Sequence, residues 1–207
     1  MARATMPPDA LSRPDPAPLL ERTRAQWGGQ GELWVFAYGS LIWRPEFEAV
    51  ERRDALVHGW HRALRLRSRI NRGTPERPGL VFALLSGGSC RGVVYRMDER
   101  RAQEELDRLW AREMPMAVYD PRWLPCRTPQ GVVRALAFTL SRRSDVCTPH
   151  LGDEELLQIL RCAHGRYGST LDYLVETAIA LRAHGMRDRE IERLMRLVER
   201  EGLIARR

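Results

Sequence analysis

The sequence has no lysine, so all 34 of its basic residues are arginine. We interpret this bias as the mark of a GC-rich coding genome, although arginine does suit phosphate and carboxylate groups. The formal net charge of +7 permits anionic partners without demonstrating one. Long apolar runs are also absent: none approaches the roughly 18–20 residues of a membrane-spanning helix, so we expect no membrane partner.

Cysteine is scarce, with four residues and no C-x-x-C pair among them. The five histidines form no ligand-spaced cluster with the cysteines, so we expect no metal site. A chain of this length does not need disulfides to be stable, which predicts reduced thiols in a cytoplasmic protein. The sequence also lacks the G-x-S-x-G, P-loop, G-x-G-x-x-G and H-E-x-x-H motifs, so its chemistry must lie in other residues.

The chain has 207 residues, of which 43% are hydrophobic and 29% charged, a composition typical of one globular domain. Residues 1–31 are rich in proline, alanine and arginine. We expect them to form a flexible leader with one short helix near residues 19–27. They hold acidic residues and no apolar segment, which argues against a targeting signal. The folded domain is predicted to span residues 32–207.

The middle of this domain is predicted to be rich in strands. Apolar or alternating runs indicate strands at residues 33–38, 58–70, 80–85, 92–97, 118–124 and 132–140. The Ser-Gly-Gly-Ser run at residues 86–89 predicts a hairpin turn, and Asp98 is expected to cap a helix that ends near Trp110. Helical periodicity follows at residues 153–164, 170–184 and 188–199. The fold class is therefore α+β, in one domain.

The first candidate for chemistry is the run Tyr-Gly-Ser-Leu-Ile-Trp at residues 38–43, where a predicted buried strand ends. Gly39 lets the backbone approach a ligand closely, and free N–H groups in such a turn can hold an anion. Ser40 adds a hydroxyl group. An ordinary strand-end turn with aromatic side chains in the core is the alternative, and the local chemistry alone favours that alternative.

The second candidate is Glu113, which lies in a Trp/Met/Pro-rich stretch at a predicted helix end. Desolvation would raise the pKa of this carboxyl toward the range of a general base. Arg112 would oppose that shift if the two side chains paired. A helix-terminal glutamate in a structural salt bridge is the alternative, and it is the better interpretation of Glu113 taken alone.

A third feature is the alternation of Arg65, Arg67 and Arg69 with apolar residues, which predicts a half-buried strand with an arginine face. Such a face could bind RNA, with retention that weakens as salt rises. Nucleic-acid recognition usually also uses exposed aromatic residues or a recognition helix, and neither is evident here. A solvated face is the preferred interpretation.

Several segments, in order along the chain, carry a resemblance to a known family. They include residues 34–43 (WVFAYGSLIW), 59–62 (GWHR), 72–75 (RGTP), 78–79, 92–96 (GVVYR), 110–114 (WAREM), Tyr119, 151–152 and 168–174 (GSTLDYL). Together, over about residues 33–200, they resemble the ChaC-type γ-glutamylcyclotransferase family. The chain departs from that family at Ala37, often a glycine, at Gly165-Arg166, usually Gly-Pro, and around Ser169-Thr170, usually with an asparagine. The last two departures bear on how the C-terminal segment closes over substrate.

The resemblance implies a small mixed β-barrel flanked by helices, with a pocket at one mouth of the barrel. The implied reaction converts glutathione into 5-oxoproline and Cys-Gly without cofactor or metal. Glu113 would be the general base and then the acid, and Tyr173 would hydrogen-bond the γ-glutamyl end. The remaining substrate-binding residues implied are Val35, Phe36, Ala37, Tyr38, Gly39, Ser40 and Leu41.

Two alternatives remain open. The same chemistry could act on another γ-glutamyl amine or dipeptide, since only the leaving group would differ. A basic RNA-binding module is the more distant alternative, because it leaves Glu113 and the Tyr38 turn unexplained. We expect a small-molecule substrate and no nucleic-acid partner; the sequence leaves the oligomeric state open, and a monomer is compatible with it.

Overall fold

The computed structural model describes residues 15–205, and its centre is a closed barrel of five strands in the order β1-β3-β2-β4-β5. The strands are β1 (Trp34–Ala37), β2 (Ala49–Ser68), β3 (Gly79–Met97), β4 (Asp120–Thr128) and β5 (Gly131–Thr139). β1 runs antiparallel to β3 and parallel to β5, so the barrel is mixed. The predicted α+β class and the barrel are both confirmed.

β1 lies in the core of the protein, and all four of its residues are buried. This burial agrees with the continuous apolar run in the sequence, because a strand covered on both faces needs no polar alternation. The same apolar core includes Leu106 and Trp110 from one helix and Leu174 and Leu181 from another. Helices from both halves of the chain therefore cover the barrel.

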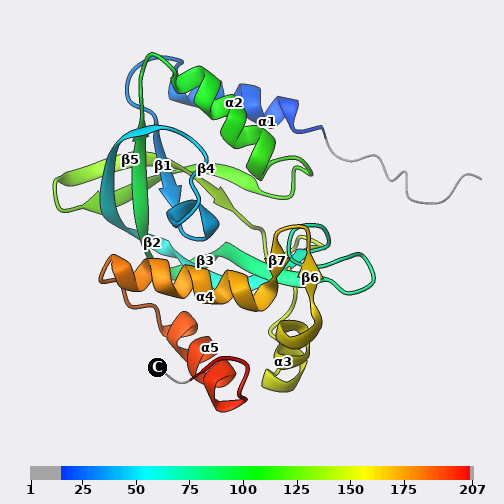
Figure 1. Cartoon of the computed structure of the whole chain (residues 1–207). Helices are drawn as coiled ribbons and strands as arrows, with labels where there is room; N and C mark the ends of the chain where they lie inside the picture. The colour runs from blue at the N-terminus through cyan, green and yellow to red at the C-terminus, as the bar shows by residue number, and fades with distance from the viewer. Residues whose placement is uncertain (1–14, 206–207) are drawn as a thin grey trace, which may run out of the picture.

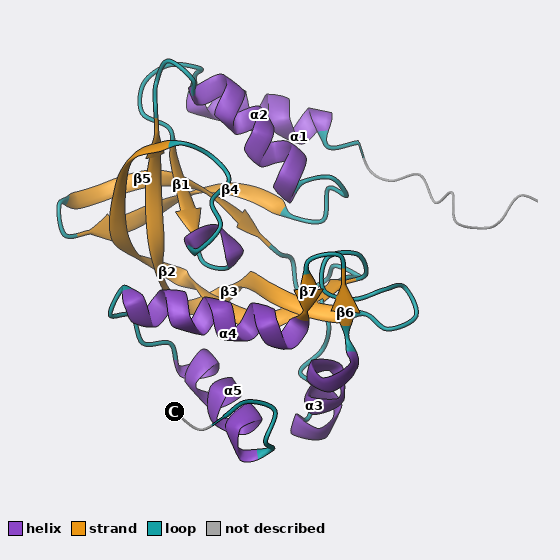
Figure 2. Cartoon of the chain, in the orientation of Figure 1, coloured by secondary structure: helices purple, strands orange, loops and turns teal. Residues whose placement is uncertain are grey.

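The helices form two groups around the barrel (Figures 1 and 2). α1 (Ala17–Trp27) and α2 (Ala102–Glu113) lie side by side at one end, and α4 (Thr170–Ala183) crosses the opposite side. α3 (Asp153–Cys162) and α5 (Arg189–Arg200) pack against α4. A short hairpin of β6 (His164–Gly165) and β7 (Gly168–Ser169) precedes α4, and the 3-10 helix η1 (Ser40–Ile42) follows β1. The three predicted C-terminal helices are confirmed.

α1 lies within the range predicted as a leader, and it is attached to the domain. The Trp110 indole N–H donates to the Pro16 carbonyl at 3.3 Å, and Arg24 pairs with Asp107 of α2. Arg134 of β5 also donates to the Gln26 carbonyl at 3.1 Å. Residues 17–27 thus form the predicted helix in a packed position, whereas residues 1–14 lie outside the described residues.

The predicted hairpin at residues 86–89 is wrong, because this segment lies inside the single long strand β3. Gly87 and Gly88 have φ of 98° and 72°, and the register against β2 shifts opposite them, beside Gly59 with φ of 80°. Glycine adopts such angles without steric cost, so these residues form an irregularity in the ladder instead of reversing the chain. The reversal occurs at residues 69–78, between β2 and β3.

The predicted cap at Asp98 is also wrong. The N-cap of α2 is Arg101, and the helix begins at Ala102. The Asp98 carboxylate instead accepts a hydrogen bond from the Arg100 N–H at 3.0 Å. Aspartate often bonds the backbone two residues on in this way, which closes a turn ahead of a helix instead of starting it.

β2 begins at Ala49, well before the predicted strand. The first half of this strand was missed in the sequence because it carries charged side chains in place of an apolar run. Arg53 Nε lies 2.5 Å from Glu51, and Arg96 of β3 lies 2.9 Å from the same carboxylate. At the other end, the predicted strand ran to residue 70, but β2 ends at Ser68 and Ile70 is 53% exposed. Charged pairs therefore extend the strand at one end, and the turn shortens it at the other.

The predicted arginine face is partly covered by another segment of the chain. The Arg65 guanidinium donates to the Thr148 carbonyl at 2.8 Å, and the Arg67 N–H donates to the Val146 carbonyl at 2.9 Å. Both side chains are half-buried, whereas Arg69 is exposed. This arrangement gives Arg65 a structural partner, and the RNA hypothesis stays a prediction.

Candidate active site

A pocket opens where β1 ends, and residues distant in sequence meet there. Its empty volume is about 290 Å³, part of it open to solvent. The lining residues come from the turn after β1, from β3, from the end of α2 and the loop that follows, from β5 and from α4: Tyr38, Gly39, Ser40, Leu41, Phe82, Glu113, Tyr119, Phe138 and Tyr173. The pocket thus joins both sequence candidates.

Gly39 is required by the close approach of α4 to this turn. A Cβ at residue 39 would lie 2.7 Å from the Tyr173 hydroxyl oxygen, which is too close for any real side chain. That hydroxyl accepts a hydrogen bond from the Phe82 N–H at 3.2 Å, so the ring is held in place. The absence of a side chain at Gly39 therefore lets Tyr173 line the pocket.

A buried arginine supports the turn from behind. The Arg62 side chain is fully buried, and it donates to the Tyr38 carbonyl and to the Arg91 carbonyl at 2.5 and 2.6 Å. Its third partner is the Asp188 carboxylate at 2.5 Å, which also caps α5 by accepting from the N–H groups of Glu190 and Ile191. Arg62 thereby links β2, the start of the turn and α5.

Glu113 is the last residue of α2, and its side chain is only 15% exposed. Burial raises the pKa of the Glu113 carboxyl, and the Arg112 guanidinium opposes that effect. Arg112 Nε lies 3.0 Å from Glu113 Oε1, so the pair that the sequence left open does form. Burial is the larger of the two influences, which leaves Glu113 a stronger base than an exposed glutamate.

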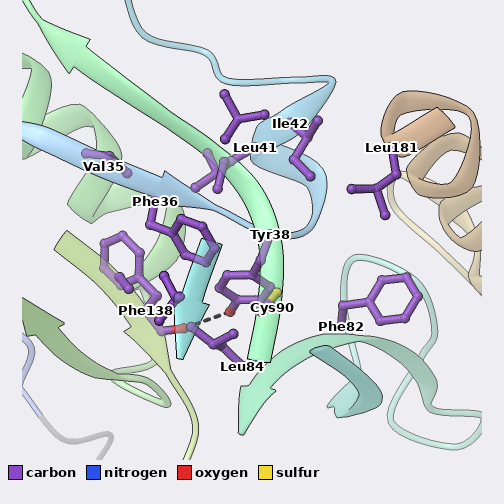
Figure 3. Close-up of a cluster of buried hydrophobic side chains, with 14 of the residues drawn as sticks. Val35, Phe36, Tyr38, Leu41, Ile42, Phe82, Leu84, Cys90, Phe138 and Leu181 are labelled. Atoms are coloured by element: carbon purple, nitrogen blue, oxygen red, sulfur yellow. Dashed lines mark hydrogen bonds between the residues drawn. The ribbon is translucent and has the colours of Figure 1, made fainter. Parts of the chain in front are cut away.

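Three tyrosines surround the carboxylate. The Tyr38 hydroxyl donates to the Phe138 carbonyl at 2.7 Å, the dashed line in Figure 3. Burial raises the pKa of Tyr38 and of Tyr119 well above the usual value, and that of Tyr173 to about 12. All three phenols therefore keep their protons at neutral pH and serve as neutral hydrogen-bonding groups.

The structure brings together most of the predicted site residues. Six of them line the pocket: Glu113, Tyr173, Tyr38, Gly39, Ser40 and Leu41. The other three lie in β1, fully buried or nearly so, and do not line it: Val35, Phe36 and Ala37.

Three lining residues were not predicted as site residues: Phe82, Tyr119 and Phe138. Tyr119 belongs to a segment that carries the family resemblance, which is a usable signal. Phe82 and Phe138 stand in ordinary apolar strand patterns, so the sequence does not distinguish them from the core.

The C-terminal departures from the family pattern fit the local structure. Ser169 is the N-cap of α4, where its hydroxyl accepts from the Asp172 N–H at 2.9 Å. Serine and asparagine are both favoured caps. The Arg166 N–H donates to the Ile70 carbonyl at 2.8 Å, a bond that proline could not make. This bond fastens the β6–β7 hairpin to the turn that follows β2.

Within residues 15–205, no three His, Cys, Asp or Glu side chains gather as metal ligands would. Among the helices described there, none has the length and apolar character to cross a membrane.

Known proteins are similar to this chain in sequence and in fold. The family model described as ChaC-like protein matches residues 33–201. The glutathione-specific gamma-glutamylcyclotransferase of Escherichia coli (strain K12) is 35% identical over 170 residues, which cover 82% of this chain and 74% of that protein. The glutathione-specific gamma-glutamylcyclotransferase 1 of Mus musculus is 34% identical over 190 residues, covering 86% of this chain and 80% of the mouse protein.

A solved structure shares the fold as well. The crystal structure of a yeast gamma-glutamyl cyclotransferase specific to glutathione superposes with a TM-score of 0.75 at 21% identity, covering 83% of this chain and 97% of the yeast chain. The family model spans the barrel and all three C-terminal helices, and the bacterial and mouse relatives match most of the chain. The chain therefore belongs to the ChaC-like protein family.

Proposed function

We propose that this protein cyclises the γ-glutamyl group of glutathione, a lyase reaction that yields 5-oxo-L-proline and L-cysteinylglycine. Its bacterial and mouse relatives carry the name of glutathione-specific enzymes. The observation that carries the proposal is the placement of the buried Glu113 carboxylate in one pocket with the turn that follows β1. A base and a set of hydrogen-bond donors are the two things that this reaction needs.

The chemistry requires a proton to move twice. The α-amino nitrogen attacks the γ-carbonyl carbon and closes a five-membered ring, while the amide bond to the cysteinyl nitrogen breaks. Because the amine is an ammonium at neutral pH, a base has to remove a proton before the attack. Glu113 takes that proton and returns it to the departing cysteinyl nitrogen as the amide bond breaks. The ring nitrogen loses a second proton when it becomes an amide, and this proton passes through the same carboxylate and leaves Cys-Gly as an ammonium, so no water or co-reactant is consumed.

The turn after β1 binds the negative groups of the substrate. The first N–H groups of a helix have no partner within it, and Ser40 and Leu41 occupy these positions in η1. Together with the Ser40 hydroxyl they hold the substrate carboxylate or the developing oxyanion, and Tyr173 holds the γ-glutamyl end. Fixing the flexible γ-glutamyl chain in a folded shape contributes on the order of several kcal/mol to the rate.

The test is mass-spectrometric detection of 5-oxoproline and Cys-Gly from purified protein and glutathione. Glu113→Gln should fold normally and lose nearly all product, because glutamine cannot accept the proton. Glu104→Gln is the matched control, since Glu104 lies on the same helix with a side chain that is 55% exposed. Normal turnover by Glu113→Gln would show that Glu113 is not the general base. No product from the wild type would overturn glutathione as substrate and direct the assay to other γ-glutamyl compounds.

We also propose the cytoplasm as the compartment. All four cysteines lie within residues 15–205 and none of them is paired there. Unpaired cysteines in a chain of this size are typical of a reducing compartment.

A further inference from the structure

Arg112 connects the two chemical halves of the pocket. Its guanidinium contacts Glu113 through Nε at 3.0 Å and donates from Nη2 to the Ser40 hydroxyl oxygen at 3.2 Å. Its Nη1 lies 3.1 Å from Glu46 and donates to the Arg44 carbonyl. The Arg112 side chain is 19% exposed. All three nitrogens thus have partners, and these come from α2, η1 and the loop that follows η1.

The contact with Ser40 determines which way its hydroxyl can act. A serine hydroxyl has one proton to donate and two lone pairs to accept with. Because Arg112 donates to Oγ, the Ser40 proton stays available for an acceptor in the pocket. The same guanidinium therefore makes Ser40 a donor and keeps a positive charge beside the base.

We propose that Arg112 is a positioning residue that sets the polarity of the pocket: it keeps Glu113 ionised as the acceptor and turns the Ser40 hydroxyl into a donor. This inference rests on the proposed function and deepens it. The γ-glutamyl end of the substrate carries an ammonium and a carboxylate, and these two groups match an acceptor and a donor held by one side chain.

The charge around Glu113 makes this role measurable. Burial raises the pKa of Glu113, Arg112 lowers it, and Glu46, which pairs with Nη1 of Arg112, raises it. The other titratable groups that face the carboxylate from packed elements are phenols with raised pKa values: Tyr38, Tyr119 and Tyr173. These phenols stay neutral through the acidic and neutral range. The fall of kcat/KM at low pH, the acid limb of its pH profile, therefore reports the protonation of Glu113.

The first experiment follows the pH dependence of kcat/KM for glutathione. Arg112→Met should move the acid limb to higher pH, and Glu46→Gln should move it to lower pH, since the two variants remove charges of opposite sign. Arg108→Met is the matched control: Arg108 lies on the same helix with a side chain that is 53% exposed, and it pairs with Glu104. Its acid limb should coincide with that of the wild type.

The second experiment separates charge from geometry. Arg112→Lys retains the positive charge but loses the planar fork that reaches three partners. We expect its acid limb to stay near that of the wild type while kcat/KM falls at every pH. Ser40→Ala should also lower kcat/KM at every pH without moving the limb, and it should cost less in the Arg112→Lys background than in the wild type.

A readout that needs no turnover keeps the two proposals distinguishable. Infrared difference spectra between the wild type and Glu113→Gln report the protonation of the Glu113 carboxyl directly. The same difference in an Arg112→Met background should show protonation at higher pH. An unmoved Glu113 titration in Arg112→Met, or equal costs of Ser40→Ala in the wild-type and Arg112→Lys backgrounds, would overturn the role of Arg112. Absence of 5-oxoproline from the wild type would overturn only the proposed function.

Discussion

Replacing Gly39 by alanine tests the packing that shapes the pocket. The new Cβ would lie 2.7 Å from the Tyr173 hydroxyl oxygen, whereas its next neighbours, Phe82 Cβ and Tyr173 Cζ, would stand at an ordinary 3.9 Å. The conflict is therefore with one atom. Because this atom accepts the Phe82 N–H, Gly39→Ala has to displace the ring and weaken that hydrogen bond.

The magnitude follows from these contacts. Inserting a methyl group into a packed site costs about 1–3 kcal/mol of unfolding free energy. Tyr173→Phe leaves the Phe82 N–H without its partner, which costs about 1–3 kcal/mol by itself. In the double variant the phenylalanine leaves room for the methyl group, so the two costs should not add. We expect a coupling of ~1–3 kcal/mol between the sites.

The assay is urea unfolding followed by circular dichroism for the wild type, both single variants and the double variant. Any backbone preference of residue 39 is present in both backgrounds and cancels in the cycle. An m-value that stays constant across the four proteins shows that the free energies are comparable. If Gly39→Ala costs as much in the Tyr173→Phe background as in the wild type, the clash does not exist and the packing argument fails.

Three further predictions concern charge and thiols. Burial raises the pKa of Glu113, and a general base must be ionised to act. As the pH is lowered, kcat/KM should therefore begin to fall at a higher pH than it would with an exposed glutamate as the base, which a pH profile of kcat/KM checks. Asp188→Asn keeps a capping side chain but leaves the Arg62 charge buried without its counter-ion, so urea unfolding should show a loss of ~3 kcal/mol. Ellman's reagent should label the exposed Cys162 in the native protein, whereas the buried Cys90, whose thiol pKa is raised, should react only after unfolding.

The sequence alone was enough for most of the secondary structure. The apolar residues of β1, β4 and β5 and the periodicity of the C-terminal helices are local patterns, and each of these elements formed within a few residues of its predicted place. The predictions that failed at Asp98 and at residues 86–89 were also local, and the limits of β2 at both ends differed from the predicted strand as well. The glycines of residues 86–89 are compatible with a turn, but the pairing of β3 with all of β2 keeps them within a strand. Asp98 is compatible with a helix cap, but α2 begins only at Ala102, with Arg101 as its N-cap.

The assembly of the candidate site depends on the tertiary structure. Tyr38 and Glu113 are candidates from their local chemistry, but each is better explained by core packing or a salt bridge when taken alone, and only the resemblance made them the expected site residues. Closure of the barrel brings the end of β1, the end of α2 and α4 to one pocket, where Phe82 and Phe138 complete the wall. The sequence does not show that these segments lie close together.

The ion pair of Arg112 and Glu113 shows the same division. From the sequence we could identify two opposing effects on the pKa of the Glu113 carboxyl, burial and the adjacent arginine. The sequence does not show how deeply the carboxyl is buried or whether the two side chains point toward each other. Those depend on how α2 packs against the turn after β1, which also gives Arg112 its contact with Ser40. The sequence determined which acidic, basic and hydroxyl groups the protein has. The packing of distant segments determined which of these groups meet in the pocket and how deeply they are buried, and the pKa values and hydrogen bonds depend on that distance and solvent access.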